Sequence, residues 1–193
     1  MYALYLINFF KGLQIMYRDK NESDEPKFIV DTMLGNVARW LRMLGYDTLY
    51  DRKYEDWKIL DIARKEGRII ITRDRGLHHR ALNNGIKSIY LDMDEVSERL
   101  AYIAYVAGIR LHIDMDKSRC PLCNGELRKA KKKEVEGKVP RKVYLLHDDF
   151  WICTRCGKIY WIGSHWRKIE EILSEARKKY EAIKRSMGRK IVR

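Results

Sequence analysis

Four cysteines form the clearest chemical motif of this 193-residue chain, because they fall into two Cys-x-x-Cys pairs separated by 29 residues. Thiolates at this spacing bind Zn²⁺ tetrahedrally, and a site with sulfur at all four positions is structural rather than catalytic. A redox-active pair would open a helix after a strand, and neither pair has that sequence context. We therefore expect a zinc site formed by Cys120, Cys123, Cys153 and Cys156.

Aspartates form a second candidate site, because several of them follow apolar runs in the first half of the chain. The carboxyl ends of parallel strands meet at one edge of a sheet, where ligands bind. Carboxylates gathered there repel one another, and Mg²⁺ or Mn²⁺ would relieve that repulsion, bind phosphate oxygens and activate water. Any single one of them is also a common turn or capping residue. The candidates are Asp31, Asp56, Asp74, Asp92 and Asp94.

The elements that would position these acids alternate between short apolar runs and helical patterns. We expect strands at 28–30, 47–50, 68–72 and 86–91, and helices at 36–44, 56–67, 77–83 and 95–106. In the second helix, Trp57 is assigned to the apolar face. Strands that alternate with helices predict right-handed βαβ units, so the expected class is α/β with a mostly parallel sheet flanked by helices.

Charge is distributed unevenly along the chain. Residues 1–116 hold 18 basic and 18 acidic side chains, so residues 117–193 carry the whole formal net charge of +13. Such an asymmetry favours a nucleic-acid partner for the second half, and a solvated lysine-rich surface is the alternative. Residues 128–142 are expected to form a basic hairpin or loop, and a helix with one apolar and one basic face begins at Trp166.

Several classes of protein are excluded by composition. The sequence has no run of eighteen apolar residues, so we expect no membrane span. The apolar stretch 2–10 lacks a basic flank and a cleavage site, so a secretory signal is not expected, and residues 1–26 are assigned to an N-terminal extension. Paired cysteines without an export signal indicate metal binding in a reducing cytoplasm.

Two long segments of the first half, 28–48 and 67–77, resemble the Mut-seven C-terminal RNase family, and segments 118–125 and 160–166 of the second half resemble it as well. The resemblance covers about residues 27–169. It implies a PIN-like nuclease domain at 27–116, a small four-cysteine zinc ribbon at 117–165, and a basic C-terminal helix and tail at 166–193.

The resemblance also implies a function, that of a metal-dependent ribonuclease which hydrolyses RNA phosphodiester bonds with a basic zinc ribbon for RNA binding. Asp31, Asp56 and Asp74 would be three of the acids that hold Mg²⁺ or Mn²⁺, and the fourth would be Asp92 or Asp94. Ribosomal or transfer RNA is the expected partner. The alternative is a non-catalytic RNA- or protein-binding module with a degenerate acidic site.

Polar and basic residues near the acids fit the same function. Thr72, two residues before the third acid, is expected to place a metal-bound water. His78 and His79 are interpreted as surface histidines. The expected RNA contacts are Arg39, Arg42, Arg73 and Arg75 near the acids, and Lys131, Lys132 and Lys133 between the cysteine pairs.

Overall fold

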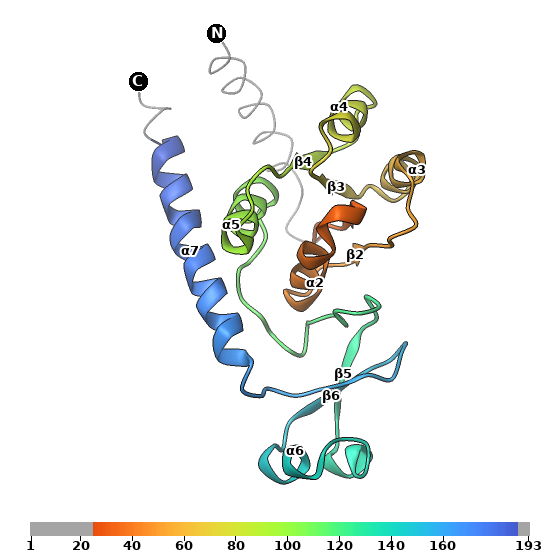
Figure 1. Cartoon of the computed structure of the whole chain (residues 1–193), viewed down its shortest axis with the longest axis vertical. Coiled ribbons are helices and arrows are strands. Elements are labelled where there is room, and N and C mark those ends of the chain that lie inside the picture. The colour runs from red at the N-terminus through yellow and green to blue at the C-terminus, as the bar shows by residue number, and fades with distance from the viewer. Residues whose placement is uncertain (1–24, 189–193) are drawn as a thin grey trace.

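A four-stranded parallel sheet forms the centre of the computed structural model, which describes residues 25–188 (Figure 1). The strand order is β2-β1-β3-β4. The strands are β1 (Phe28–Val30), β2 (Thr48–Leu49), β3 (Ile69–Thr72) and β4 (Ser88–Tyr90). The expected α/β class with a parallel sheet is confirmed, and each strand lies within its expected range.

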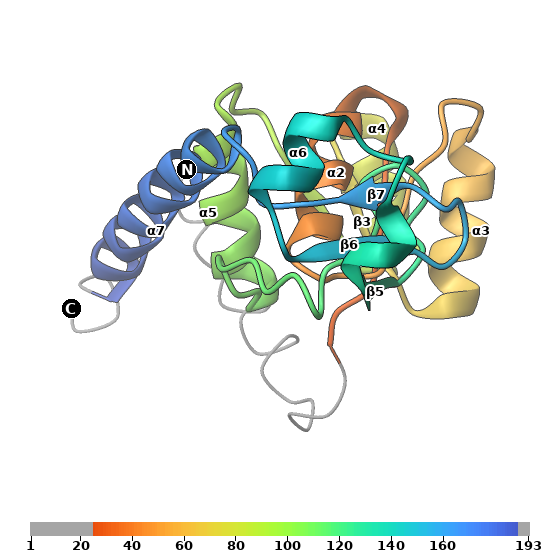
Figure 2. The same ribbon diagram turned by 90° about the horizontal axis from the view of Figure 1, so that it is seen from below.

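Helices cover both faces of this sheet, because alternate residues of each strand are buried on opposite sides. Phe28 and Val30 pack toward α2 and α5, whereas Ile29 packs toward α3 and α4. Figure 2 shows α3 and α5 on opposite sides of the resulting layers. The bounds are η1 (Thr32–Leu34), α2 (Gly35–Met43), α3 (Asp56–Glu66), α4 (Arg75–Asn83) and α5 (Val96–Ala107).

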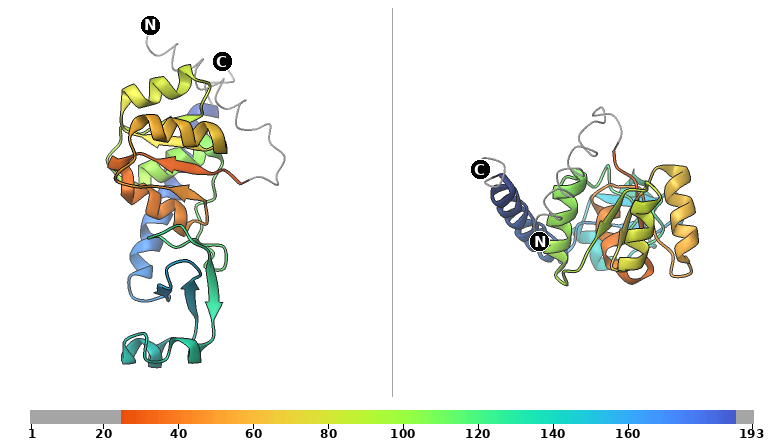
Figure 3. Two further views of the ribbon diagram at one scale, coloured as in Figure 1. Left: turned by 90° about the vertical axis from the view of Figure 1, so that its right-hand side faces the viewer. Right: turned by 90° about the horizontal axis from the view of Figure 1, so that it is seen from above.

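The parallel sheet and its helices form the larger lobe of the molecule. A smaller antiparallel sheet lies at one end of this lobe (Figure 3); Cys153 belongs to one of its strands, and the other three cysteines lie outside the strands. Its order is β5-β6-β7, with β5 (Leu127–Ala130), β6 (Phe150–Cys153) and β7 (Ile159–Tyr160). Between β5 and β6 lie η2 (Lys132–Val135) and α6 (Arg141–Leu146). At 128–142 we expected a hairpin or loop: β5 does pair antiparallel with β6, as in a hairpin, but the connection between them also forms η2 and α6. Val135 of η2 is fully buried in a cluster with Phe150.

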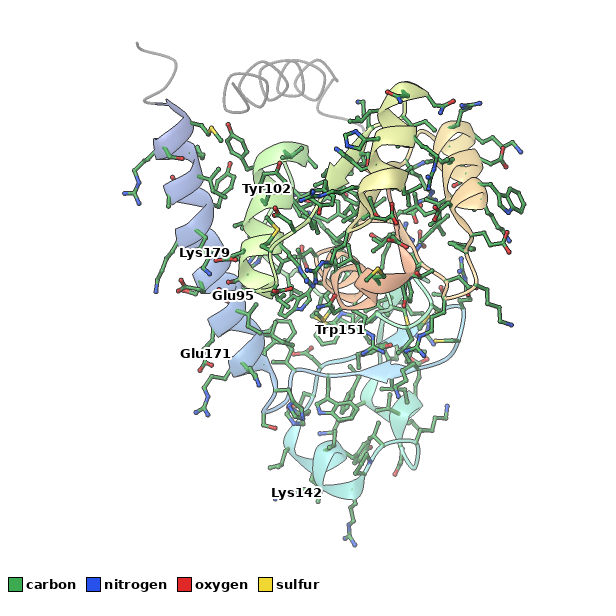
Figure 4. The ribbon with its side chains drawn as sticks, turned by 45° about the horizontal axis from the view of Figure 1, so that its top comes forward. Glu95, Tyr102, Lys142, Trp151, Glu171 and Lys179 are labelled. Carbon is green, nitrogen blue, oxygen red and sulfur yellow. The ribbon has the colours of Figure 1, made fainter. Side chains whose placement is uncertain are left out.

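The last helix, α7 (Trp166–Gly188), packs along α5 of the larger lobe. Leu173 and Ala176 are fully buried in the core that covers one face of the parallel sheet. Lys179 forms ion pairs with Glu95 and Glu98 across the two helices, and Figure 4 shows Lys179 beside Glu95. The amphipathic face predicted from the sequence is thus buried against the larger lobe.

Arg42 of α2 joins the larger lobe to the first cysteine pair. Its side chain is buried, Nε donates to the Thr48 carbonyl at 2.9 Å, and Nη1 donates to the carbonyls of Pro121 and Leu122 at 3.1 and 3.2 Å. Its guanidinium is committed to this interface, so we do not include Arg42 in an RNA-binding surface.

Asn124 makes the matching contact from the cysteine side. Its φ of 65° turns the chain after Cys123, and its side chain accepts a hydrogen bond from the Thr48 amide and donates one to Asp47. Although partial burial acts in the opposite direction, hydrogen bonds from Arg68 and Asn124 hold the pKa of Asp47 below its usual range. The edge strand β2 is therefore anchored by the cysteine unit.

The expected N-terminal extension, residues 1–26, lies outside the described residues except for its last two positions. Within residues 25–188, no helix is both long and apolar enough to cross a membrane.

Candidate active site and metal centre

β1 and β3 are neighbours at the centre of the sheet, so their carboxyl ends lie side by side. From β1 the chain continues to β2 on one side of this pair, and from β3 it continues to β4 on the other side. Open parallel sheets bind ligands at such a topological switch point. Asp31 continues the ladder directly after β1, since its amide donates to the Ile71 carbonyl at 2.9 Å. Asp74 stands two residues beyond the end of β3. The structure therefore places both acids at the edge expected from the sequence.

Thr72 joins these two acids. Its hydroxyl donates to Asp31 Oδ2 at 2.8 Å and accepts from the Asp74 amide at 2.9 Å. A hydroxyl has one proton, and here that proton is directed at Asp31. Asp31 Oδ1 also accepts from the Thr32 amide at 2.5 Å and from the Thr32 hydroxyl at 3.2 Å. The contacts of Thr72 orient the buried carboxylate of Asp31, and the placing of a metal-bound water by Thr72 stays a prediction.

Asp74 caps α4, because its Oδ1 accepts from the Leu77 amide at 2.7 Å. Its Oδ2 accepts no hydrogen bond from the described residues. A Cβ at Gly76 would stand 3.0 Å from Asp74 Oδ1 and 3.2 Å from Arg80 Nη1, so a side chain at this position would crowd both groups. Arg80 in turn pairs with Asp56 at the start of α3. Arg80 thus links Asp56 to the neighbourhood of Asp74.

Asp92 and Asp94 are both exposed but face different partners. Asp94 lies 2.9 Å from Arg73, the residue between Thr72 and Asp74, and 3.8 Å from Arg99. The charge of Asp92 acts on Arg75, the residue after Asp74, and on Tyr102, whose pKa burial raises to about 12. Both acids are therefore linked to residues that flank Asp74, and the contacts do not select one of them as the fourth acid.

The aspartates share one edge without forming a tight group. Within residues 25–188, only the four cysteines form a set of three or more Asp, Glu, His or Cys side chains whose ligand atoms could hold one ion together. Asp56 and Asp94 are instead paired with Arg80 and Arg73.

The arginines predicted to contact RNA differ in the ion pairs and hydrogen bonds that their side chains form. Arg73 pairs with Asp94, and Arg75 donates to the Tyr90 hydroxyl at 3.2 Å. Arg39 is exposed and lines a polar cleft beside Asp31, together with two arginines that sequence analysis did not select, Arg52 and Arg99. No pattern in the sequence brings these three positions together, because they belong to different elements.

Trp57 and His78 also differ from expectation. The Trp57 ring is 64% exposed at the start of α3, so its assignment to the apolar face was wrong, and Ile59 and Ala63 form the buried face. His78 is half-buried, and its Nδ1 lies 2.9 Å from the Ser88 hydroxyl. Burial, together with the charge of neighbouring His79, lowers the pKa of His78 to about 4. His78 is therefore not a surface histidine.

The lysines between the cysteine pairs lie in and around η2. Lys132 pairs with Asp148 at 2.7 Å and stands 5.3 Å from the centre of the Tyr144 ring. Lys131 and Lys133 are exposed and form no ion pair with a described residue. Two of the three predicted RNA contacts are therefore available to a polyanion.

The four cysteine sulfurs converge as a tetrahedral zinc site requires. Cys120 Sγ lies 3.7 Å from Cys156 Sγ, Cys123 Sγ lies 3.4 Å from Cys153 Sγ, and all four lie within 4.8 Å of one another. Zn–S bonds of about 2.3 Å in a tetrahedron place sulfurs about 3.8 Å apart, whereas a disulfide needs about 2.05 Å. The residues therefore fit a zinc ion, which would be structural because every ligand is a thiolate.

Backbone turns and one tyrosine support these thiolates. The Tyr160 hydroxyl lies 3.0 Å from Cys120 Sγ. Although burial acts against it, hydrogen bonding by Tyr160 and by backbone amides lowers the pKa of Cys120 to about 7. At Gly125 a Cβ would stand 2.9 Å from Cys153 Sγ and 2.8 Å from the Arg155 side chain, so a larger residue would intrude on the site.

The fold and the site together define a two-part α/β protein, in which a parallel sheet with acids at its switch point is joined to a unit whose four cysteines could bind a metal ion. The model of the Mut7-C RNAse domain family matches residues 26–173, and the chain belongs to this family. The match begins just before β1 and ends within α7, so it includes both units and the helix that returns to the larger lobe. No curated protein and no solved structure matched the chain.

Proposed function

We propose that this protein is a metal-dependent ribonuclease of the PIN-like type that hydrolyses RNA phosphodiester bonds at the β1–β3 switch point. The observation that carries the proposal is the hydrogen-bonded link from Asp31 through Thr72 to Asp74. A buried carboxylate held in one orientation, at the same sheet edge as a second carboxylate whose Oδ2 accepts no hydrogen bond from the described residues, suits a site that binds a divalent cation. Membership of an RNAse domain family supports RNA as the substrate.

The donor set of the two acids fits Mg²⁺ or Mn²⁺. A carboxylate offers about four acceptor positions, and Asp31 uses three of them on Thr32 and Thr72. Asp74 uses one, on the Leu77 amide. A divalent ion held here would polarise a phosphoryl oxygen and lower the pKa of a water molecule. Asp56 and either Asp92 or Asp94 are proposed as the remaining acids.

The second unit would bind the RNA strand. Residues 117–193 carry the net positive charge, and Lys131 and Lys133 are exposed without ion pairs to described residues. Near the acids, the Trp57 ring is 64% exposed and could stack on a base, and the Met33 side chain, 70% exposed, offers an apolar contact. Ribosomal or transfer RNA is the proposed substrate class, and a cytoplasmic location is the proposed setting.

A second candidate function is a non-catalytic RNA-binding module. Arg80 on Asp56 and Arg73 on Asp94 neutralise two of the proposed acids, and this observation favours a degenerate site. In that case the lobe would bind RNA without cutting it.

A nuclease assay on the full-length, zinc-loaded chain separates the two functions. End-labelled RNA is incubated with Mn²⁺, with Mg²⁺ and with neither ion, using the parent, Asp31→Asn and the control Asp61→Asn, whose side chain pairs with Lys65 on the surface of α3. We expect Mn²⁺-dependent cleavage by the parent and the control, and none by Asp31→Asn. RNA binding without cleavage by any of the three would support the non-catalytic module.

A further inference from the structure

A polar cleft of 580 Å³ opens beside Asp31 and contains an unusual concentration of arginine. Arg39 comes from α2, Arg52 from the segment after β2, and Arg99 from α5. No aspartate or glutamate is among the described residues that line it. Arg99 has one described acidic partner, Asp94 at 3.8 Å, and Asp94 is closer to Arg73. Three guanidinium groups with so little acidic compensation make the cleft a site for an anion.

The charges in the cleft are poorly compensated. Arg39 and Arg52 are exposed and form no ion pair with a described residue. The Arg99 side chain is only 7% exposed, and its Nε donates to the Met93 carbonyl at 2.8 Å. Its nearest carboxylate, Asp94, lies at 3.8 Å from Nη2 and is closer to Arg73.

The electrostatic environment of Arg99 is unfavourable for its charge. Burial and the neighbouring charge of Arg73 lower the pKa of Arg99, and Asp94 offsets this only in part. An anion bound in the cleft would supply the missing charge and would accept the hydrogen bonds that Arg99 does not make within the described chain.

The wall of the cleft is held in place by Tyr50. Its hydroxyl donates to the Thr32 carbonyl at 3.1 Å, and a Cβ at Gly35 would stand 2.6 Å from the Tyr50 hydroxyl oxygen. Thr32 directly follows Asp31, and Arg99 approaches Asp94. The cleft therefore adjoins the proposed catalytic acids on two sides.

We propose that this arginine cleft binds the terminal phosphate monoester of an RNA strand, an inference that rests on the proposed ribonuclease function. A terminal monoester carries a charge of about −1.5 to −2 near neutral pH, whereas a phosphodiester inside the strand carries one negative charge. Two guanidinium groups without ion pairs to described residues, together with the partly compensated Arg99, match the monoester better, and its three free oxygens allow several bidentate contacts. The bound end would place the adjoining nucleotides against Asp31 and Asp74.

Equilibrium binding in buffer without added Mg²⁺ or Mn²⁺ tests this site without relying on cleavage. The full-length zinc-loaded protein is titrated with one eight-nucleotide RNA in three forms: with a 5′-phosphate, with a 3′-phosphate, and with hydroxyls at both ends. We expect one phosphorylated form to bind about tenfold more tightly than the hydroxyl form, as charge-assisted hydrogen bonds predict. The end that gives this increase identifies which terminus enters the cleft.

Variants assign the preference to the cleft. Arg52→Gln, at an exposed position, and Arg99→Lys, which keeps the charge but removes the planar fork, should reduce the preference to within about twofold. The control Arg141→Gln, on exposed α6, should leave the preference unchanged. Equal affinity for all three RNAs, including no measurable binding of any, would overturn the inference. If the protein binds the phosphorylated RNA more tightly but does not cleave RNA, the proposed catalysis is wrong and the phosphate site remains supported.

Discussion

The Thr72 hydroxyl lies 2.8 Å from Asp31 Oδ2, so a fully buried side chain of β3 holds the carboxylate that follows β1. The same hydroxyl accepts from the Asp74 amide. One threonine therefore sets the relative position of the two strand ends at the switch point of the sheet.

Replacement of Thr72 tests this link. Thr72→Val keeps the shape of the side chain but leaves Asp31 Oδ2 and the Asp74 amide without a partner, which should cost about 1–3 kcal/mol of stability. Activity should fall about 10–100-fold, as for the loss of other groups that orient metal ligands. Thr72→Ser keeps the hydroxyl and should retain most of the activity. Denaturant unfolding and cleavage rates measure both effects, and equal rates for the valine and serine variants would argue against an orienting role.

The zinc site should support the larger lobe as well as its own sheet. Cys153→Ser should abolish the binding of one Zn²⁺ per chain, measured by elemental analysis. Because Asn124 accepts a hydrogen bond from the Thr48 amide, the exchange of that amide with solvent should also become faster when zinc is lost. Thr154→Ser, next to the ligand, is the control. Unchanged exchange at Thr48 in the zinc-free protein would show that the two units are independent.

RNA affinity should depend on salt through the basic second unit. If about five phosphates are contacted, single-stranded binding should show a log–log salt slope of about −3.5. Replacing Lys131, Lys132 and Lys133 with serine should reduce the slope by about 1.4, because only Lys131 and Lys133 are without ion pairs to described residues. Lys65→Ser on α3 serves as the control. A slope unchanged by the triple replacement would place the RNA elsewhere.

The sequence predicted the parallel sheet and the switch-point acids because local patterns determine both. Apolar runs mark strands, and Asp31 and Asp74 follow them closely in the chain. The arginine cleft was missed, since Arg39, Arg52 and Arg99 meet only through tertiary packing. The packing of α7 on α5 was missed for the same reason. Leu173 and Ala176 belong to the core of the larger lobe, so a protein shortened by residues 117–193 would lose part of that core. Point variants therefore test the RNA-binding role of the second unit better than a deletion does.

Neighbouring arginines reduce the electrostatic repulsion that the sequence predicts among the aspartates. Arg80 pairs with Asp56, and Arg73 pairs with Asp94. Asp31 accepts hydrogen bonds from Thr32 and Thr72, so Asp31→Asn should not increase the stability of the protein. Sequence patterns show where charges fall along the chain but not which side chains neutralise them.

His78 should make stability depend on pH. Its pKa of about 4 in the folded protein lies below the ordinary value of 6.5, so the unfolded chain binds more protons between these values. The stability that depends on neutral His78 is therefore complete above pH 6.5 and is lost as the pH falls toward 4. His78→Asn should lose less stability than the parent over this range in thermal melts, and the control His112→Asn should follow the parent. Parallel curves for the parent and His78→Asn would contradict this.

The central claim is that Asp31 and Asp74 act as one catalytic site, and the single-turnover cleavage rate at saturating RNA and Mn²⁺ tests it most directly. The rate is measured for the parent, Asp31→Asn, Asp74→Asn and the double variant, each below its melting temperature. Residues of one catalytic unit are non-additive, so all three variants should fall by the same factor, at least about a hundredfold. Cleavage at the parent rate by either single variant would contradict the account.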